Sequence, residues 1–129
     1  MIHLDTSALI AALTADRRAA PGLRRLIADG HRLAISTLVL YEWRRGPRTA
    51  DEIADQEQFV PSATAVPFGP REAAAAAALY ARVPRARRRE IDIAIAASAI
   101  AHGASLWTLN PRDFADIAGL DVIGPRPPR

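Results

Sequence analysis

Short apolar runs alternate with longer amphipathic stretches along most of the chain. The runs have the length of single strands, and we expect strands at 1–4, 33–35, 63–66, 105–109 and 121–123. Between them, apolar residues recur at helical spacing or alanine predominates, which predicts helices. The predicted helices cover Ser7–Leu13, Pro21–Ala28, Leu38–Arg45, Thr49–Phe59, Arg71–Arg82 and the segment EIDIAIAASAIAHG, followed by a helical turn over Pro111–Ile117.

The segment EIDIAIAASAIAHG has features of both a strand and a helix. Its stretch IDIAI alternates in the way that a half-buried strand does. The whole segment, however, is long, rich in alanine, acidic in its first turn and closed by Gly103, which favours a helix. Because apolar residues run almost all round it, we expect a central, buried helix.

Polar residues mark the ends of the predicted helices. We expect Thr6 or Ser7 to cap the first helix and Ser36 or Thr37 to cap the third. The resulting alternation of strands and helices favours a parallel sheet with helices on both faces. Ligands bind beyond the carboxyl ends of the strands in such sheets, so candidate functional residues should lie at that edge.

The composition fits one folded domain. The chain has 129 residues, half of them hydrophobic, and we assign residues 1–123 to a single domain and 124–129 to a Pro-rich tail. We expect no membrane segment and no signal peptide, which makes the cytoplasm the expected location. The chain has no Cys, which excludes disulfides and thiolate metal sites.

Four acids occupy positions that a parallel sheet would bring together. Asp5 follows the first predicted strand, Asp92 lies in the first turn of the buried helix, and Asp113 follows the fourth strand. Taken singly, each has an ordinary explanation as a helix cap, a helix-dipole partner or a turn residue. Glu42 is harder to explain. We expect its helix, with the apolar segment LVLYEW, to be largely buried, and a carboxylate there is costly unless it is paired, protonated or bound to a cation.

Acids that gather at one edge would repel one another, and a hard divalent cation is the usual remedy. Mg²⁺ and Mn²⁺ prefer oxygen ligands and fit such a set. The three histidines, His3, His31 and His102, are scattered along the chain and do not suggest a zinc site. His3 would share a strand face with Asp5, and we expect it to be a packing residue or to support the acids indirectly, not to be a metal ligand.

Three segments resemble a known family: LDTSALI, ISTLVLYEWRRG and REIDIAIAASAIAHGASLWTLNPRDFADIAGLDVI. In this order they resemble PIN-domain ribonucleases, and most closely the VapC-type toxins of bacterial toxin–antitoxin pairs. Residues 49–85 match by pattern alone. The resemblance implies a three-layer α/β/α PIN-like fold around a mainly parallel sheet.

The resemblance also implies a set of catalytic metal ligands. The first three family acids fall on Asp5, Glu42 and Asp92, which would hold one or two Mg²⁺ or Mn²⁺ ions. The family's fourth position varies between those of Asn110 and Asp113. We take Asp113 as the fourth ligand and Asn110 as a neutral ligand or water-holding residue.

The implied activity is metal-assisted hydrolysis of RNA phosphodiester bonds, in which the ion activates water and offsets charge on the phosphate. Thr6 and Thr108 match family hydroxyls that orient the acids. The resemblance implies a homodimer neutralised by a cognate antitoxin. Two alternatives stay open: a PIN-like binding module with weak or no catalysis, and a receiver-like or phosphatase-like domain. The latter requires a late Lys, and this chain has none.

Arginine supplies all 17 Lys-or-Arg positions, and the net charge is +3. The densest basic stretch, RVPRARRRE, has the ordinary explanation of a solvated charge run. Arginines just before a helix N-terminus nevertheless oppose the helix dipole, which suggests an anionic partner. We therefore expect RNA phosphates or antitoxin carboxylates to meet the arginines of this stretch and two that follow Glu42: Arg85, Arg87, Arg88, Arg89, Arg44 and Arg45.

Overall fold

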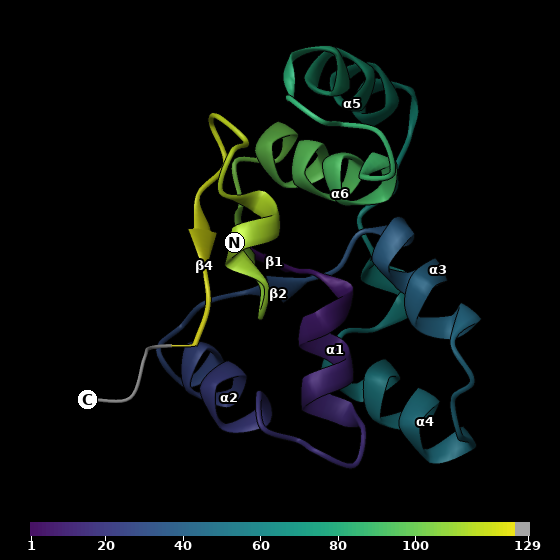
Figure 1. Ribbon diagram of the computed structural model, residues 1–129. Helices are drawn as coiled ribbons and strands as arrows, with labels where there is room; N and C mark the ends of the chain where they lie inside the picture. The colour runs from purple at the N-terminus through teal and green to yellow at the C-terminus, as the bar shows by residue number, and fades with distance from the viewer. Residues whose placement is uncertain (126–129) are drawn as a thin grey trace.

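A computed structural model describes residues 1–125, and they form four parallel strands and six α-helices (Figure 1). The sheet has the order β2-β1-β3-β4, with β1 at Ile2–Leu4, β2 at Leu33–Ala34, β3 at Ser105–Trp107 and β4 at Val122–Ile123. The α-helices are α1 (Thr6–Leu13), α2 (Ala20–Ala28), α3 (Thr37–Arg45), α4 (Ala50–Phe59), α5 (Pro70–Arg82) and α6 (Glu90–Ala101). Two short 3₁₀ helices, η1 (Ser62–Thr64) and η2 (Pro111–Phe114), complete the fold.

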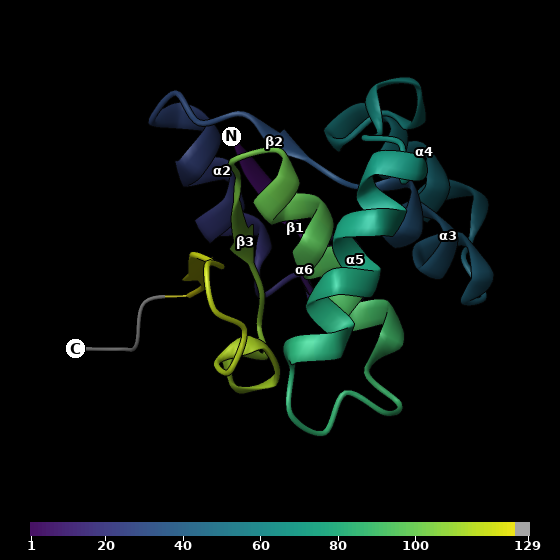
Figure 2. The same ribbon diagram turned by 90° about the horizontal axis from the view of Figure 1, so that it is seen from above.

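The helices form layers on the two faces of the sheet. Helix α6, backed by α5, covers one face, and α1 and α2 lie on the other (Figures 1 and 2). All three residues of β1 are buried, as expected of a central strand in a parallel sheet. The predicted three-layer α/β/α architecture is confirmed.

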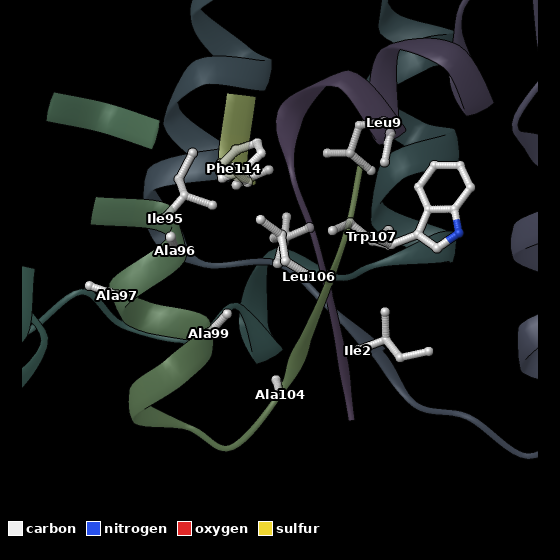
Figure 3. Packing of buried hydrophobic residues seen from close by; sticks show 14 of the residues in the cluster. Ile2, Leu9, Ile95, Ala96, Ala97, Ala99, Ala104, Leu106, Trp107 and Phe114 are labelled. Atoms are coloured by element: carbon white, nitrogen blue, oxygen red, sulfur yellow. The ribbon is translucent and has the colours of Figure 1, made fainter. Parts of the chain in front are cut away.

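The side chains of β3 link the two helical layers. Leu106 points toward Ile95 and Ala99 of α6, whereas Trp107 points to the opposite face, on the side of Leu9 of α1 (Figure 3). This alternation is the two-residue period of a strand. Leu106 is completely buried and Trp107 is 4% exposed, so one short strand contributes to both halves of the core.

The prediction of a buried helix over EIDIAIAASAIAHG is confirmed by α6. Seven consecutive residues, Ile93 to Ala99, are buried. Four of these seven are alanines, whose small side chains allow α5 and the sheet to approach closely (Figures 2 and 3). Gly103 follows the helix with φ +63°, a conformation that glycine adopts at no steric cost.

Several predicted boundaries are wrong. Residues 63–66 form no strand: η1 ends at Thr64, and Val66 makes only an isolated parallel bridge to Ser36. Strand β3 ends at Trp107 rather than at 109, and η2 ends at Phe114 rather than at 117. The two errors in the strands share one physical reason. The parallel partner strands are two or three residues long, so additional apolar residues have no neighbour to pair with.

The prediction that the segment LVLYEW is largely buried is wrong. In α3, Val39 and Trp43 are completely buried, but Tyr41 is 63% exposed. Residues four apart share a helix face, whereas a residue two positions away points elsewhere. Glu42 is therefore half-buried at the margin of the core.

Within residues 1–125, no helix is both long enough and apolar enough to span a membrane. The proposed end of the domain at residue 123 stays a prediction. Residues 126–129, most of the predicted Pro-rich tail, lie outside the described part of the chain.

Candidate active site

The four predicted acids line one cleft of about 220 Å³ beyond the carboxyl ends of β1 and β3. Asp5 follows β1, Glu42 lies on α3, Asp92 on α6 and Asp113 on η2, so four separate elements each supply one carboxylate. The complete lining consists of these acids together with Thr6, Ser7, Ile95, Asn110 and Phe114.

Asp5 is the most firmly held of the four carboxylates. One oxygen accepts hydrogen bonds from Ser7 Oγ at 2.6 Å and from the backbone N of Ala8 at 3.1 Å, and the other accepts one from Thr108 Oγ1 at 2.6 Å. Asp5 is therefore the N-cap of α1, in place of the predicted Thr6 or Ser7. Only 6% of Asp5 is exposed, and burial raises its pKa although these three donors act against the shift.

Among the described residues, a single side chain donates a hydrogen bond to Glu42. Thr6 Oγ1 donates to Glu42 Oε1 at 2.6 Å, across 36 residues of sequence. Thr6 follows Asp5 directly, so the turn from β1 into α1 places one acid and the donor to a second acid in the same cleft.

Asp92 accepts no hydrogen bond from any described residue, although it is half-buried in the first turn of α6. Burial raises the pKa of this carboxyl, and the negative charges of Glu42, Asp113 and Asp5 raise it further, against the nearby positive charge of Arg89. An acid that is desolvated and repelled by three others favours its neutral form. A cation in the cleft would reverse that preference.

Asp113 and Asn110 form the exposed side of the cleft. Asn110 immediately precedes η2, and its backbone N donates to Thr108 Oγ1 at 2.9 Å. The backbone N of Asp113 in turn donates to the carbonyl of Asn110 at 3.0 Å. Thr108 therefore contacts both Asp5 and the segment that carries the fourth acid.

Ser7 is a site residue that the sequence reasoning missed. Besides donating to Asp5, its hydroxyl accepts a hydrogen bond from the backbone N of Leu109 at 3.2 Å. The signal in the sequence was its place in DTS, where a hydroxyl two residues after an aspartate can reach back to the carboxylate. Ile95 and Phe114, which supply the apolar part of the lining, had no signal of their own.

None of the six predicted arginine contacts belongs to the lining of the cleft. Arg44 pairs with Glu57 at 3.0 Å, and the guanidinium of Arg45 lies 6.0 Å from the centre of the Tyr41 ring. Arg89 is turned inward and pairs with Asp116 at 2.7 Å. The other three, Arg85, Arg87 and Arg88, are exposed.

The donor set suits a hard divalent cation, because it consists of carboxylate, hydroxyl and amide oxygens. Across residues 1–125, no three His, Asp or Glu side chains are arranged to hold one metal ion as they stand. Mg²⁺ keeps several waters and needs only one or two direct carboxylates, so a loosely gathered set of acids is compatible with it.

A larger hollow of about 410 Å³ lies beside α2 and contains no acid among its lining residues, which include Arg18, Trp107 and Pro125. The chemistry favours the smaller cleft, because two carboxyls with raised pKa values converge there, whereas no acid lines the larger hollow.

Comparison with known proteins identifies a family whose sequence pattern matches this chain. A sequence model of the PIN domain matches residues 2–120. No curated protein sequence matched the chain significantly.

Solved structures with a similar fold come from toxin–antitoxin complexes. VapBC2 from Rickettsia felis, bound to a DNA fragment of its promoter, has a TM-score of 0.77 and 21% identity, covering 98% of this chain and 100% of that one. DNA-bound VapBC from Salmonella typhimurium has a TM-score of 0.75 and 22% identity, covering 95% of this chain and 96% of that one. VapBC-5 from Mycobacterium tuberculosis has a TM-score of 0.60 and 28% identity, covering 97% of each chain.

Proposed function

Because the chain belongs to the PIN domain family, we propose that it is the VapC-type toxin of a toxin–antitoxin pair and hydrolyses RNA. One observation carries the proposal. Four carboxylates from distant parts of the chain line one cleft at the carboxyl edge of a parallel sheet, and one of them, Asp92, has no donor among the described residues. Such an arrangement costs stability, which favours a functional origin.

In this proposal, Asp5, Glu42 and Asp92 hold one or two Mg²⁺ or Mn²⁺ ions, and Asp113 is the fourth ligand with Asn110 beside it. A divalent ion bound there would make hydroxide available near neutral pH and offset the charge that develops on the phosphate. The protein's own part is to orient the acids. Ser7 and Thr108 hold the two oxygens of Asp5 in place, and Thr6 does the same for one oxygen of Glu42.

The proposed partners are RNA, a cognate antitoxin and a second copy of the chain, all in the cytoplasm. Structural neighbours that are VapBC complexes support the antitoxin. Arg85, Arg87 and Arg88 are exposed and form no side-chain hydrogen bond or ion pair with other described residues, so they remain available for phosphates or carboxylates. For Arg44 and Arg45 the same role requires that they leave Glu57 and Tyr41.

The first test is RNA cleavage by the antitoxin-free protein with Mg²⁺, Mn²⁺ or EDTA, beside Asp5→Asn. Asparagine is as good an N-cap as aspartate, so this variant keeps α1 capped while it removes the charge and replaces one acceptor oxygen by a donating amide group. Asp51→Asn, a change of the same type at an exposed site on α4, is the matched control. We expect metal-dependent cleavage that Asp5→Asn abolishes and Asp51→Asn leaves intact.

A broad pool of structured RNAs is needed, because a toxin of this kind can have a narrow target. Calorimetric titration with Mn²⁺ separates the remaining outcomes. Metal binding without cleavage of any RNA would point to a target outside the pool. Intact RNA together with no metal binding would reject the nuclease and favour a PIN-like binding module.

A further inference from the structure

Arg89, the last arginine of the basic stretch, makes hydrogen bonds to distant parts of the chain, unlike its neighbours. Arg89 occupies the N-cap position of α6 but forms no side-chain cap there, and its side chain is 23% exposed. Its Nη1 donates to Asp116 Oδ2 at 2.9 Å and its Nη2 to Asp116 Oδ1 at 2.7 Å, a two-pronged ion pair. Pairs of this geometry fix orientation as well as contributing energy.

The same guanidinium also bonds to two backbone carbonyls. Nη2 donates to the carbonyl of Asp113 at 2.9 Å, and Nη1 donates to that of Pro84 at 3.2 Å. From the N-cap of α6, one side chain therefore joins the loop before this helix to the segment η2.

The segments that Arg89 joins carry two of the four acids. Asp92 lies three residues after Arg89 on α6, and Asp113 is itself a carbonyl partner of Arg89. These two acids repel each other, which tends to separate η2 from α6. η2 is only four residues long, with no side-chain cap and with Phe114 as its single buried residue, so it has little else to resist that repulsion.

We propose that Arg89 and Asp116 form a clamp that positions Asp113 against Asp92, so that Arg89 is a positioning residue of the active site rather than a contact to RNA. This inference rests on the proposed function. It divides the basic stretch in two: Arg89 orders the acids, whereas Arg85, Arg87 and Arg88 face solvent and are left for partners.

Substitution of Asp116 distinguishes the clamp from an RNA contact, because the two predict opposite results. If Arg89 bound phosphate, Asp116→Ala would release it and make the surface more positive, so RNA would bind more tightly. If Arg89 is a clamp, Asp116→Ala lowers kcat by about 10- to 100-fold, the range for residues that orient metal ligands, with KM for RNA nearly unchanged.

Arg89→Ala should reproduce that loss, and the double variant should lose no more than either single one. Arg89→Lys should restore little, since an ammonium group cannot make the two-pronged contact; Lys would serve a phosphate well. The matched control is Arg82→Ala, at an exposed arginine at the end of α5 whose side chain forms no hydrogen bond or ion pair with a described residue. It removes the same charge and should leave kcat and KM as they are.

A measurement that needs no RNA tests the clamp by itself. We expect amide hydrogen exchange across residues 112–117 to become at least about tenfold faster in Arg89→Ala and Asp116→Ala, while exchange within α6 stays slow. Unchanged exchange, or a raised KM with kcat preserved and full rescue by Lys, would overturn the clamp. If the wild type neither cleaves RNA nor binds Mn²⁺, the proposed function fails, and the exchange experiment still decides whether Arg89 and Asp116 hold η2.

Discussion

The two ends of α6 deal with buried ionisable groups in opposite ways. At its N-terminal end, Asp92 faces three other acids in an open cleft and accepts no hydrogen bond from a described residue. At its C-terminal end, His102 Nε2 lies 3.1 Å from the carboxylate of Glu72, and the ring of His3 lies 5.9 Å from that of His102. His3 is 2% exposed and Glu72 is 7% exposed, so this end is closed.

The pKa shifts follow the same division. Burial and like charges raise the pKa of Asp92. The pKa of Glu72 is lowered, first by its own backbone N–H and then by that of Gly69 and by His102. The charge of Glu72 at the closed end is thus compensated within the fold, whereas at the open end burial and the three neighbouring acids outweigh the nearby charge of Arg89. The difference supports the proposal that a cation binds at the open end, whereas the closed end serves stability.

The largest expected effect comes from Asp92→Asn, which removes the uncompensated charge. We expect cleavage to fall at least about 100-fold, because a direct ligand should matter more than the residues that orient it. In EDTA at pH 7 the same variant should be more stable than the wild type. A carboxyl whose pKa is raised in the folded state opposes folding when it is ionised, and the amide resembles its neutral form.

Thermal unfolding in EDTA and in Mn²⁺ checks this prediction. The position of Asp92 in the first turn of a helix favours the charge, but its pKa is raised on balance, so the variant should have the higher Tm in EDTA. Added Mn²⁺ should stabilise the wild type more and reverse the order. A wild type that is more stable than the variant even in EDTA would show that the acids at this end are compensated after all.

The closed end should make the stability of the fold sensitive to acid. Burial, and then the charges of His102 and the N-terminus, lower the pKa of His3 from 6.5 to about 4. Below pH 6.5 the unfolded chain takes up a proton that folded His3 does not accept until about pH 4, so stability falls with pH in this window. The loss amounts to about 3 kcal/mol, because each tenfold weakening of proton binding by the folded state corresponds to about 1.4 kcal/mol.

Urea unfolding at pH 7 and at pH 4 measures this effect as a difference, so any packing change in a variant cancels. His3→Leu should remove most of the acid-induced loss, whereas His31→Leu, at an exposed position, should retain it. Equal losses in the wild type and in His3→Leu would mean that His3 is not responsible for the acid sensitivity of the fold.

Much of the fold could be predicted, because the signals are local. The alanine-rich pattern of α6 and the acid directly after β1 both reflect the chain's own periodicity. The exposure of Tyr41 was missed because an apolar run was treated as uniformly buried, although a helix buries only one face of it. The absence of a strand at 63–66 depends on how short the neighbouring strands are, which no local pattern reveals.

The candidate site also has features that local sequence signals predict and features that they do not. The convergence of the acids was expected because ligands bind beyond the carboxyl ends of parallel strands, and the cleft brings the four predicted acids together. The inward turn of Arg89 could not be predicted, because its partner Asp116 lies 27 residues later and three consecutive arginines resemble a solvated run. Contacts between distant side chains depend on the completed fold, whereas periodicity does not.

The smallest of these effects concerns Thr108, which forms hydrogen bonds with two residues of the open end. It is fully buried, and its hydroxyl donates to Asp5 and accepts from the backbone N of Asn110. Thr108→Val keeps the shape of the side chain but leaves both partners without this contact, so we expect about 1 to 2 kcal/mol of destabilisation and a cleavage rate about tenfold lower.

The control variant for Thr108→Val is Thr14→Val, at the end of α1. Thr14 Oγ1 also makes a 2.6 Å hydrogen bond, to the carbonyl of Ile10, but at an exposed position where water can replace it. Its loss should leave cleavage unchanged and alter stability little. If Thr108→Val lowers stability without lowering the rate, the hydroxyl is only a packing element and Asp5 keeps its orientation through Ser7 and the cap of α1. A rate that falls more than stability alone explains would show that the orientation of one carboxylate oxygen limits the reaction.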